Sequence, residues 1–217
     1  MVTPIFKLDS RERWRPQPVE TAEAHGKIAN QPFQLAALPA EGGRMDFPST
    51  MTDPQDTPVV GYHRAVERAG LWWHQFWLWY LRNPWQIAGV GEHEGDWEFV
   101  QIATTDEAGD HAVLMTASQH HSGGKREFWA CEVDGGRPVV YVACGSHANY
   151  FTPGTRGTDQ ANGAGRLLAD VEWREFGPWA TWLGLWGNST GRGRSPESPG
   201  QQGARWHNPH LYHSSAH

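Results

Sequence analysis

A series of short apolar segments separated by polar turns constrains the fold of this chain most strongly. Residues 71–81 are apolar almost throughout and stop at Asn83-Pro84. Periodicity alone does not separate a buried strand from a buried helix there, but the many aromatic residues favour a strand. Residues 96–104 and 111–119 form two further strand-like segments around the polar turn 105–110, which predicts a hairpin.

Asp134-Gly135-Gly136-Arg137 predicts a second hairpin, because it is a strong two-residue turn signal between segments 128–133 and 139–144. An opening strand over residues 5–9 brings the count to at least six. These strands have short polar connections, and only residues 163–173 suggest a short helix. We therefore expect a mainly β protein, an antiparallel β-sandwich with long loops and a few short helices.

The 217 residues fit one large domain or two small ones, and we expect one domain over residues 1–217. Residues 30–58 contain five prolines and Gly42-Gly43, which indicates a long irregular loop: either a lid over the site or a disordered excursion. Residues 184–205 are rich in Gly, Ser, Pro and Arg and predict another loop. No segment resembles an export signal or a membrane span, so a cytoplasmic protein is expected.

Charge and cysteine content narrow the partners and the compartment. A net charge of -6 offers no broad basic face, so a nucleic acid is a poor candidate partner and a small-molecule ligand is favoured. The hairpin at 134–137 would pair Cys131 with Val140, which leaves Cys144 roughly 13 Å away, too far for a disulfide. Reduced thiols agree with a cytoplasmic location. The oligomeric state is left open.

The segment Gly91-Glu92-His93-Glu94-Gly95-Asp96-Trp97-Glu98 carries the strongest chemical signal. In a strand, Asp96 and Glu98 share one face and Trp97 lies on the other. Two neighbouring carboxylates repel each other, and a metal ion would remove that repulsion. The glycine at 95 lets the backbone bend and return His93 to the same face, which predicts a metal site. The alternative is a pair of surface acids with His93 bonded to a turn.

Two further histidines, His120 and His147, lie where predicted strands end in glycine-containing loops. Such positions commonly assemble sites. We therefore predict catalytic roles for Glu94, His120 and His147, with Glu92 as another candidate base. The carboxylates favour Mg²⁺ or Ca²⁺, whereas ligation by His120 and His147 would favour Zn²⁺, Mn²⁺ or Fe²⁺.

Thirteen tryptophans, against eight phenylalanines, gather in two clusters. They are either ordinary core residues or the lining of a pocket for sugars, cations or apolar ligands. The pocket interpretation predicts a set of substrate-binding residues: Trp77, Trp79, Trp97, Asn149 and Tyr150.

The residues 91–98, Ser118-Gln119-His120 and 140–151 resemble the vacuolar protein sorting-associated protein 62 family. More distantly, His93-x-x-Asp96-x-Glu98 is similar to the Gly-His-Arg-His-Asp-Trp-Glu motif of necrosis-inducing Nep-like toxins. That resemblance implies a β-sandwich and a divalent cation, Mg²⁺ or Ca²⁺, bound by His93, Asp96 and Glu98. The chain departs from the toxins at Gly95, where they have a second histidine.

These observations lead to three functional hypotheses. The first is a metal-dependent enzyme acting on an apolar or glycan-like small molecule, with hydrolysis as the default reaction and a lyase or cyclase as a variant. The second is a non-catalytic module in which the ion organises a site for a lipid or sugar headgroup. In the third, the ion only holds loops together.

Overall fold

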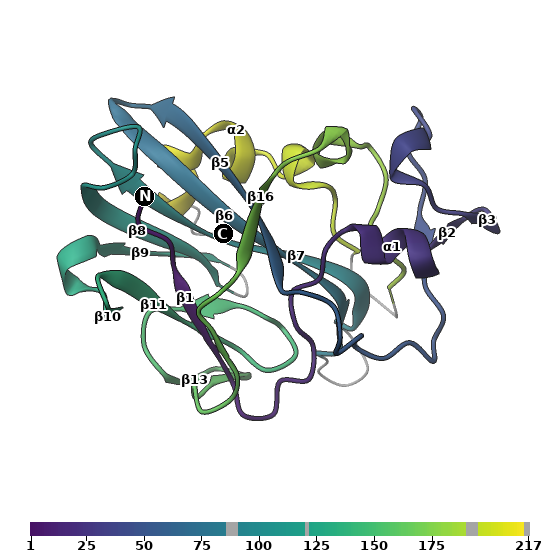
Figure 1. The fold of residues 1–217 in the computed structure, drawn as a ribbon, viewed down its shortest axis with the longest axis horizontal. Coiled ribbons are helices and arrows are strands. Elements are labelled where there is room, and N and C mark those ends of the chain that lie inside the picture. Colours follow the sequence, from purple (N-terminus) through teal and green to yellow (C-terminus); the bar gives the residue numbers. More distant parts are fainter. Residues whose placement is uncertain (86–90, 120–121, 190–194, 215–217) are drawn as a thin grey trace.

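The computed structural model describes residues 1–85, 91–119, 122–189 and 195–214, and most of their strands lie in two sheets (Figure 1). Within these residues, the larger sheet has six strands in the order β16-β5-β6-β7-β8-β9. In chain order its strands are β5 (Val60–Arg68), β6 (Leu71–Asn83), β7 (His93–Thr104), β8 (Ala112–Gln119), β9 (Ser122–Glu127) and β16 (Glu172–Glu175).

The smaller sheet has the order β10-β11-β1-β15, with β12 paired to β11. Its strands are β1 (Ile5–Leu8), β10 (Val133–Asp134), β11 (Arg137–Val142), β12 (Asn149–Tyr150) and β15 (Leu167–Leu168). In Figure 1, β1, β10 and β11 lie below the long strands of the larger sheet. The predicted mainly β sandwich is therefore confirmed.

The remaining elements are short, as expected. Among the described residues they comprise the helices α1 (Glu20–His25) and α2 (Ala204–His207), the strands β2 (Lys27–Ile28), β3 (Gln31–Pro32), β4 (Met45–Asp46), β13 (Gly154–Arg156) and β14 (Asp159–Ala161), and the 3-10 helices Leu35–Ala37, Phe128–Ala130, Pro178–Thr181, Pro199–Gln201 and Pro209–Ser214. None of the helices in the described part of the chain has the length and apolar composition needed to span a bilayer.

The sheets are mixed, which corrects the expectation of purely antiparallel pairing. Strand β1 runs parallel to β11, with Ile5 opposite Val139, and β16 runs parallel to β5. Parallel strands need long connections. These pairs join segments far apart in the sequence, so no turn signal marks them.

The two predicted hairpins are present with one correction. Strands β7 and β8 pair antiparallel, and Asp134 pairs with Arg137 around two glycines, Gly135 and Gly136, with φ values of 56° and 79°. The predicted strand 128–133 is instead a 3-10 helix over Phe128–Ala130 followed by the two residues of β10. Both cysteines are free, as expected.

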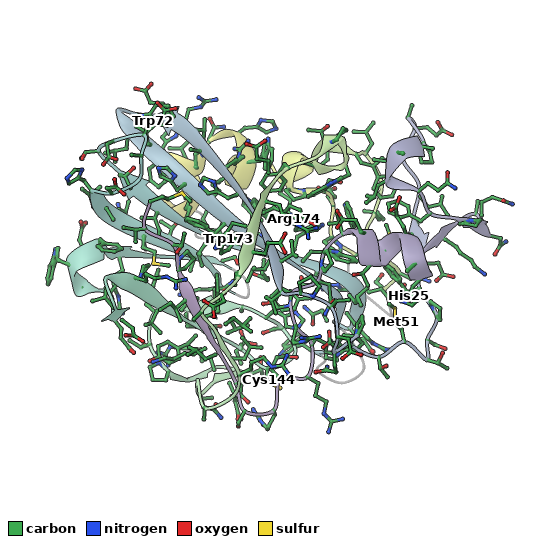
Figure 2. The ribbon with its side chains drawn as sticks, viewed as in Figure 1. His25, Met51, Trp72, Cys144, Trp173 and Arg174 are labelled. Atoms are coloured by element: carbon green, nitrogen blue, oxygen red, sulfur yellow. The ribbon has the colours of Figure 1, made fainter. Side chains whose placement is uncertain are left out.

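The helix predicted within residues 163–173 is wrong. Leu168 pairs with Phe6 as part of β15, and Trp173 packs in β16 against the rings of Phe6 and Phe76. Figure 2 shows Trp173 in the middle of the fold. Pairing and burial of these apolar side chains override the weak helical pattern.

The irregular segment 30–58 is anchored in the protein, because Phe33, Met45 and Phe47 are buried. This packing favours an ordered loop over a disordered excursion, and the lid function stays a prediction. Segment 184–205 is also mainly irregular where it is described, with the 3-10 helix Pro199–Gln201 near its end.

Two apolar cores cover the two faces of the larger sheet. The inner core fills the space between the sheets and includes Phe6, Leu78, Val100 and Val140. The second, which we call the aromatic core, lies on the opposite face. Its rings include Tyr62, Trp77, Trp79, Trp97, Phe99, Trp179, Trp182 and Trp186. The faces of β6 and β7 therefore differ in chemistry.

Candidate functional site

Asp96 and Glu98 lie side by side on the inner face of β7, as the alternation of a strand predicts. Asp96 is opposite Tyr80 and Glu98 is opposite Leu78, both of which belong to the inner core. Trp97 is opposite Trp79 and faces the aromatic core. The polar face of β7 therefore points between the two sheets.

His147 lies between two carboxylates in this interior. Its Nδ1 atom is 2.8 Å from Oδ2 of Asp96, and its Nε2 atom is 3.6 Å from Oε1 of Glu12. The exposed fractions of the His147 and Glu12 side chains are 0% and 1%. The ring of Tyr80 stacks on the imidazole at a centroid distance of 3.8 Å. The four side chains form a compact, solvent-excluded unit.

The parallel pairing of β1 and β11 creates this arrangement. Both strands end at the same edge, so the turn after β1 supplies Glu12 and the turn after β11 supplies His147. The backbone N–H groups of Trp14 and Gly145 donate to the two oxygens of Glu12, at 2.7 and 2.5 Å. His147 has a φ of 52°, which is unusual for a residue with a side chain. The tight turn holds its ring in place.

Glu98 is bound by a second set of polar groups. The Ser118 hydroxyl donates to Oε2 of Glu98, and the side-chain amide of Asn149 donates to the same oxygen at 3.4 Å. The Asn83 amide donates to Oδ2 of Asp96 at 3.1 Å. Ser118 and Asn149 are buried, whereas Glu98 is half-buried. Glu98 is therefore the carboxylate of this group that solvent reaches most easily.

The surroundings shift the pKa values of Glu98, His147 and Glu12 in different directions. Burial and the nearby charge of Asp96 raise the pKa of Glu98 well above its usual value. Burial lowers the pKa of His147, but attraction to Glu12 and hydrogen bonding to Asp96 outweigh it and raise the pKa to about 10. Burial raises the pKa of Glu12, but His147 and two backbone hydrogen bonds lower it overall. At neutral pH His147 is therefore a cation, and Glu98 holds its proton to a higher pH than an exposed glutamic acid does.

The predicted metal ligands are not brought together as one set. Nδ1 of His93 lies 2.7 Å from the carbonyl oxygen of Gly95, and His93 lines a separate cavity of about 150 Å³. Among the described residues, no three side chains of His, Cys, Asp or Glu are placed to hold a metal ion. The set His93, Asp96 and Glu98 therefore does not fit a metal centre.

Three buried polar atoms of the cluster nevertheless have no hydrogen-bond partner among the residues that the structure describes. They are Nε2 of His147, Oδ1 of Asn149 and the hydroxyl of Tyr80. Unsatisfied buried groups cost free energy and call for an explanation such as a bound ion, a water or a catalytic role.

No protein-family model matches the sequence, and no curated protein matches it. The chain is similar in structure to NLPPya in complex with glucosamine, with a TM-score of 0.47, 16% identity, and coverage of 74% of this chain and 68% of that chain. For the non-toxic HaNLP3 protein the TM-score is 0.46, with 16% identity and coverage of 74% and 69%. For Necrosis and Ethylene inducing Protein 2, from the causal agent of cocoa's Witches Broom disease, the TM-score is 0.45 and the identity is 13%. The match covers 70% of this chain and 65% of that chain. These similarities assign neither a ligand nor an activity to this chain.

Asn149 is the predicted substrate-binding residue that belongs to the cluster, whereas the hydrogen bonds of Glu94 and Tyr150 go to other residues. Glu94 accepts from the backbone N–H groups of Phe47 and Asn188, and it lines the 150 Å³ cavity with His93. The Tyr150 hydroxyl donates to Asp159 at 2.6 Å. His120 lies outside the described residues.

The predicted pocket role of three tryptophans needs correction. Trp77, Trp79 and Trp97 are 0%, 0% and 2% exposed and face the aromatic core, away from Asp96 and Glu98. The same alternation that places the acids together turns these rings to the other side of the sheet. They are core residues, so they do not line a pocket beside the acids.

Sequence reasoning missed Glu12, Ser118, Asn83 and Tyr80. Ser118 has a detectable signal, because in the β7–β8 hairpin it approaches the same face as Glu98. Glu12 has none that is local, since it reaches His147 only through the pairing of β1 with β11. The parallel pairing of distant segments therefore hid the contact between Glu12 and His147.

Proposed function

We propose that this chain is an enzyme that transfers a proton to or from a small molecule at Glu98. The observation that carries the proposal is the convergence of Glu12, Asp96 and Glu98 around His147 in the interior, where Glu98 is partly exposed and the side chains of Glu12 and Asp96 are 1% and 8% exposed. Ion pairs buried in this way are a poor source of stability, because desolvation offsets their attraction. Clusters of this kind are concentrated at functional sites.

Each group has a separate role in this proposal. Glu98 supplies the proton, because its raised pKa holds that proton to a higher pH than in an exposed glutamic acid. Ser118 and Asn149 hold the carboxyl group in one orientation. His147 is paired with Glu12 and Asp96, and its positive charge compensates these buried carboxylates next to Glu98. Protonation of a leaving-group oxygen would make the enzyme a hydrolase, and protonation of a carbon centre would make it a lyase or cyclase.

A divalent cation is the second candidate feature, and the unpartnered Oδ1 atom of Asn149 favours it. Asp96, Glu98 and Asn149 would offer oxygen ligands, which Mg²⁺ and Ca²⁺ prefer. Such an ion would neutralise the two carboxylates and polarise a substrate oxygen. If it bound a ligand without turnover, the chain would be a binding module.

The test uses the full chain with p-nitrophenyl acetate and p-nitrophenyl β-glucoside as probes. Glu98→Gln is compared with Glu107→Gln, which changes an exposed acid in the turn between β7 and β8. We expect turnover that falls about 100-fold or more in Glu98→Gln and is kept in Glu107→Gln. Equal turnover in Glu98→Gln and Glu107→Gln would show that Glu98 does not transfer the proton.

Elemental analysis of the same preparations distinguishes proton transfer by Glu98 from binding of a divalent cation by Glu98. One equivalent of Mg²⁺ or Ca²⁺ that is present in the parent and in Glu107→Gln, and absent from Glu98→Gln, would support the cation. If the metal content of the Glu98 and Glu107 variants is the same, a cation held by Glu98 is excluded.

A further inference from the structure

A cavity of about 800 Å³ lies beside the buried cluster, on the side of Glu12. It is bordered by the turn after β1, by residues 52–55 and by Cys144 and Gly145. Figure 2 shows Cys144 at the lower end of the molecule. Ligand sites commonly have volumes of roughly 300–1,000 Å³. The cavity is therefore large enough for a small organic molecule.

The lining is unusually basic for a chain with a net charge of -6. Five arginines contribute to it, and three of them form ion pairs with acids of the protein itself. The arginines of the lining are Arg11, Arg13, Arg15, Arg82 and Arg166. The ion pairs join Arg15 to Asp53 at 2.9 Å, Arg11 to Asp9 at 3.1 Å, and Arg82 to Glu92.

Arg13 and Arg166 are left with uncompensated charges. Both are exposed, and within the described residues neither has an acidic partner. Arg166 donates to the side-chain oxygen of Gln55 at 3.2 Å. Glu12, the remaining acid of the lining, is paired with His147. The surplus at this cavity is two positive charges.

We propose that this cavity binds a phosphate monoester of a small molecule, with Arg13 and Arg166 contacting the phosphate. A phosphate monoester carries a charge of about -1.5 to -2 at neutral pH, which matches two guanidinium groups better than a single carboxylate does. The planar guanidinium also donates two parallel hydrogen bonds to phosphate oxygens. Trp14 and Pro84 supply apolar surface for the organic part. This inference does not rest on the proposed role of Glu98.

The experiment measures binding of phenyl phosphate to the full chain by titration calorimetry. The test variant is the double substitution Arg13→Gln with Arg166→Gln. Arg156→Gln is the matched control, because Arg156 is also exposed and donates hydrogen bonds to Thr152 and Thr155, outside the cavity. Each single variant is included, and far-ultraviolet circular dichroism checks folding.

We expect the double variant to bind at least about tenfold more weakly than the parent, and Arg156→Gln to bind as the parent does. Added salt should weaken binding to the parent more than binding to the double variant. Absence of phenyl phosphate binding to the parent would overturn the proposal, as would an equal loss in Arg156→Gln. Benzoate carries a single negative charge. If it binds as tightly as phenyl phosphate, the site does not select a phosphate monoester, and the proposal is wrong.

Discussion

The two faces of strand β7 stabilise the protein in different ways. On the aromatic face, Trp97 contacts several rings at once, stacking on Trp179 at 5.4 Å and meeting Trp79 and Trp186 at an angle. On the polar face, Asp96 and Glu98 each depend on a few directional partners. The aromatic face stabilises the fold through the packing of large apolar side chains. The polar face instead sets the protonation states of its buried ionisable groups.

A substitution on the aromatic face must therefore keep the side-chain volume, and a substitution on the polar face must keep the charge. Apolar packing tolerates exchange between residues of similar size. A buried ion pair tolerates the loss of neither partner, because the charge that is left behind stays desolvated. Substitutions on the two faces should therefore differ in their dependence on pH.

The largest effect is expected for Trp97→Ala on the aromatic face. The side chain is 2% exposed, and its removal leaves a cavity among several rings. We expect a loss of about 3–5 kcal/mol in the free energy of unfolding, measured with urea, and the same loss at pH 5 and pH 8. Trp129→Ala is the control, because Trp129 is 85% exposed and its removal should change stability by less than about 0.5 kcal/mol. A marked pH dependence for Trp97→Ala would contradict the separation of the two faces.

His147→Gln tests the polar face and should cost about 3–5 kcal/mol at pH 6, because two buried carboxylates lose their cation. The pKa of His147 in the folded protein, about 10, lies above its usual value near 6.5. Its stabilising contribution is therefore complete below about pH 6.5 and is lost as the pH rises through about 10. Urea unfolding of both proteins from pH 6 to pH 10 measures the difference.

The control for this experiment is His111→Gln, since the side chain of His111 is 78% exposed. We expect this substitution to cost much less at every pH. If His147→Gln costs the same at pH 6 and pH 10, His147 is not the cation of the cluster.

The contrast between the faces also marks the limit of sequence reasoning. Alternation along β7 is a local property, so the sequence predicts that Asp96 and Glu98 share a face and that Trp97 faces away. Applied consistently, the same rule would have removed Trp97 from the predicted pocket. The partners Glu12 and His147 meet through a parallel pair in which Ile5 lies opposite Val139. No residue near either strand signals that pairing, so the complete cluster could not be predicted.

Glu98→Gln should have a smaller effect on stability, with the opposite sign. Because the pKa of Glu98 is raised in the folded protein, the parent loses stability as the pH rises above the usual range for a glutamic acid. The neutral amide removes that loss, and we expect a gain of about 1 kcal/mol at pH 8 and little difference at pH 4. Thermal unfolding from pH 4 to pH 8 measures it. If the variant is less stable at pH 8 and a chelator abolishes the difference, a bound cation replaces the proton at Glu98.

The smallest effect is expected for Ser118→Ala. Its hydroxyl donates to Glu98 and also accepts from the backbone N–H of Phe99 at 3.1 Å, so the substitution removes hydrogen bonds without opening a large cavity. We expect a loss of about 0.5–1 kcal/mol at pH 5. Because the Ser118 hydrogen bond lowers the pKa of Glu98 against the larger effect of burial, its removal should raise that pKa further. The fall in thermal stability with rising pH should then continue to a higher pH than in the parent. Thr116→Ala is the control, because Thr116 lies on the same strand and its buried hydroxyl has no hydrogen-bond partner in the described structure; it should leave the upper end of this fall unchanged.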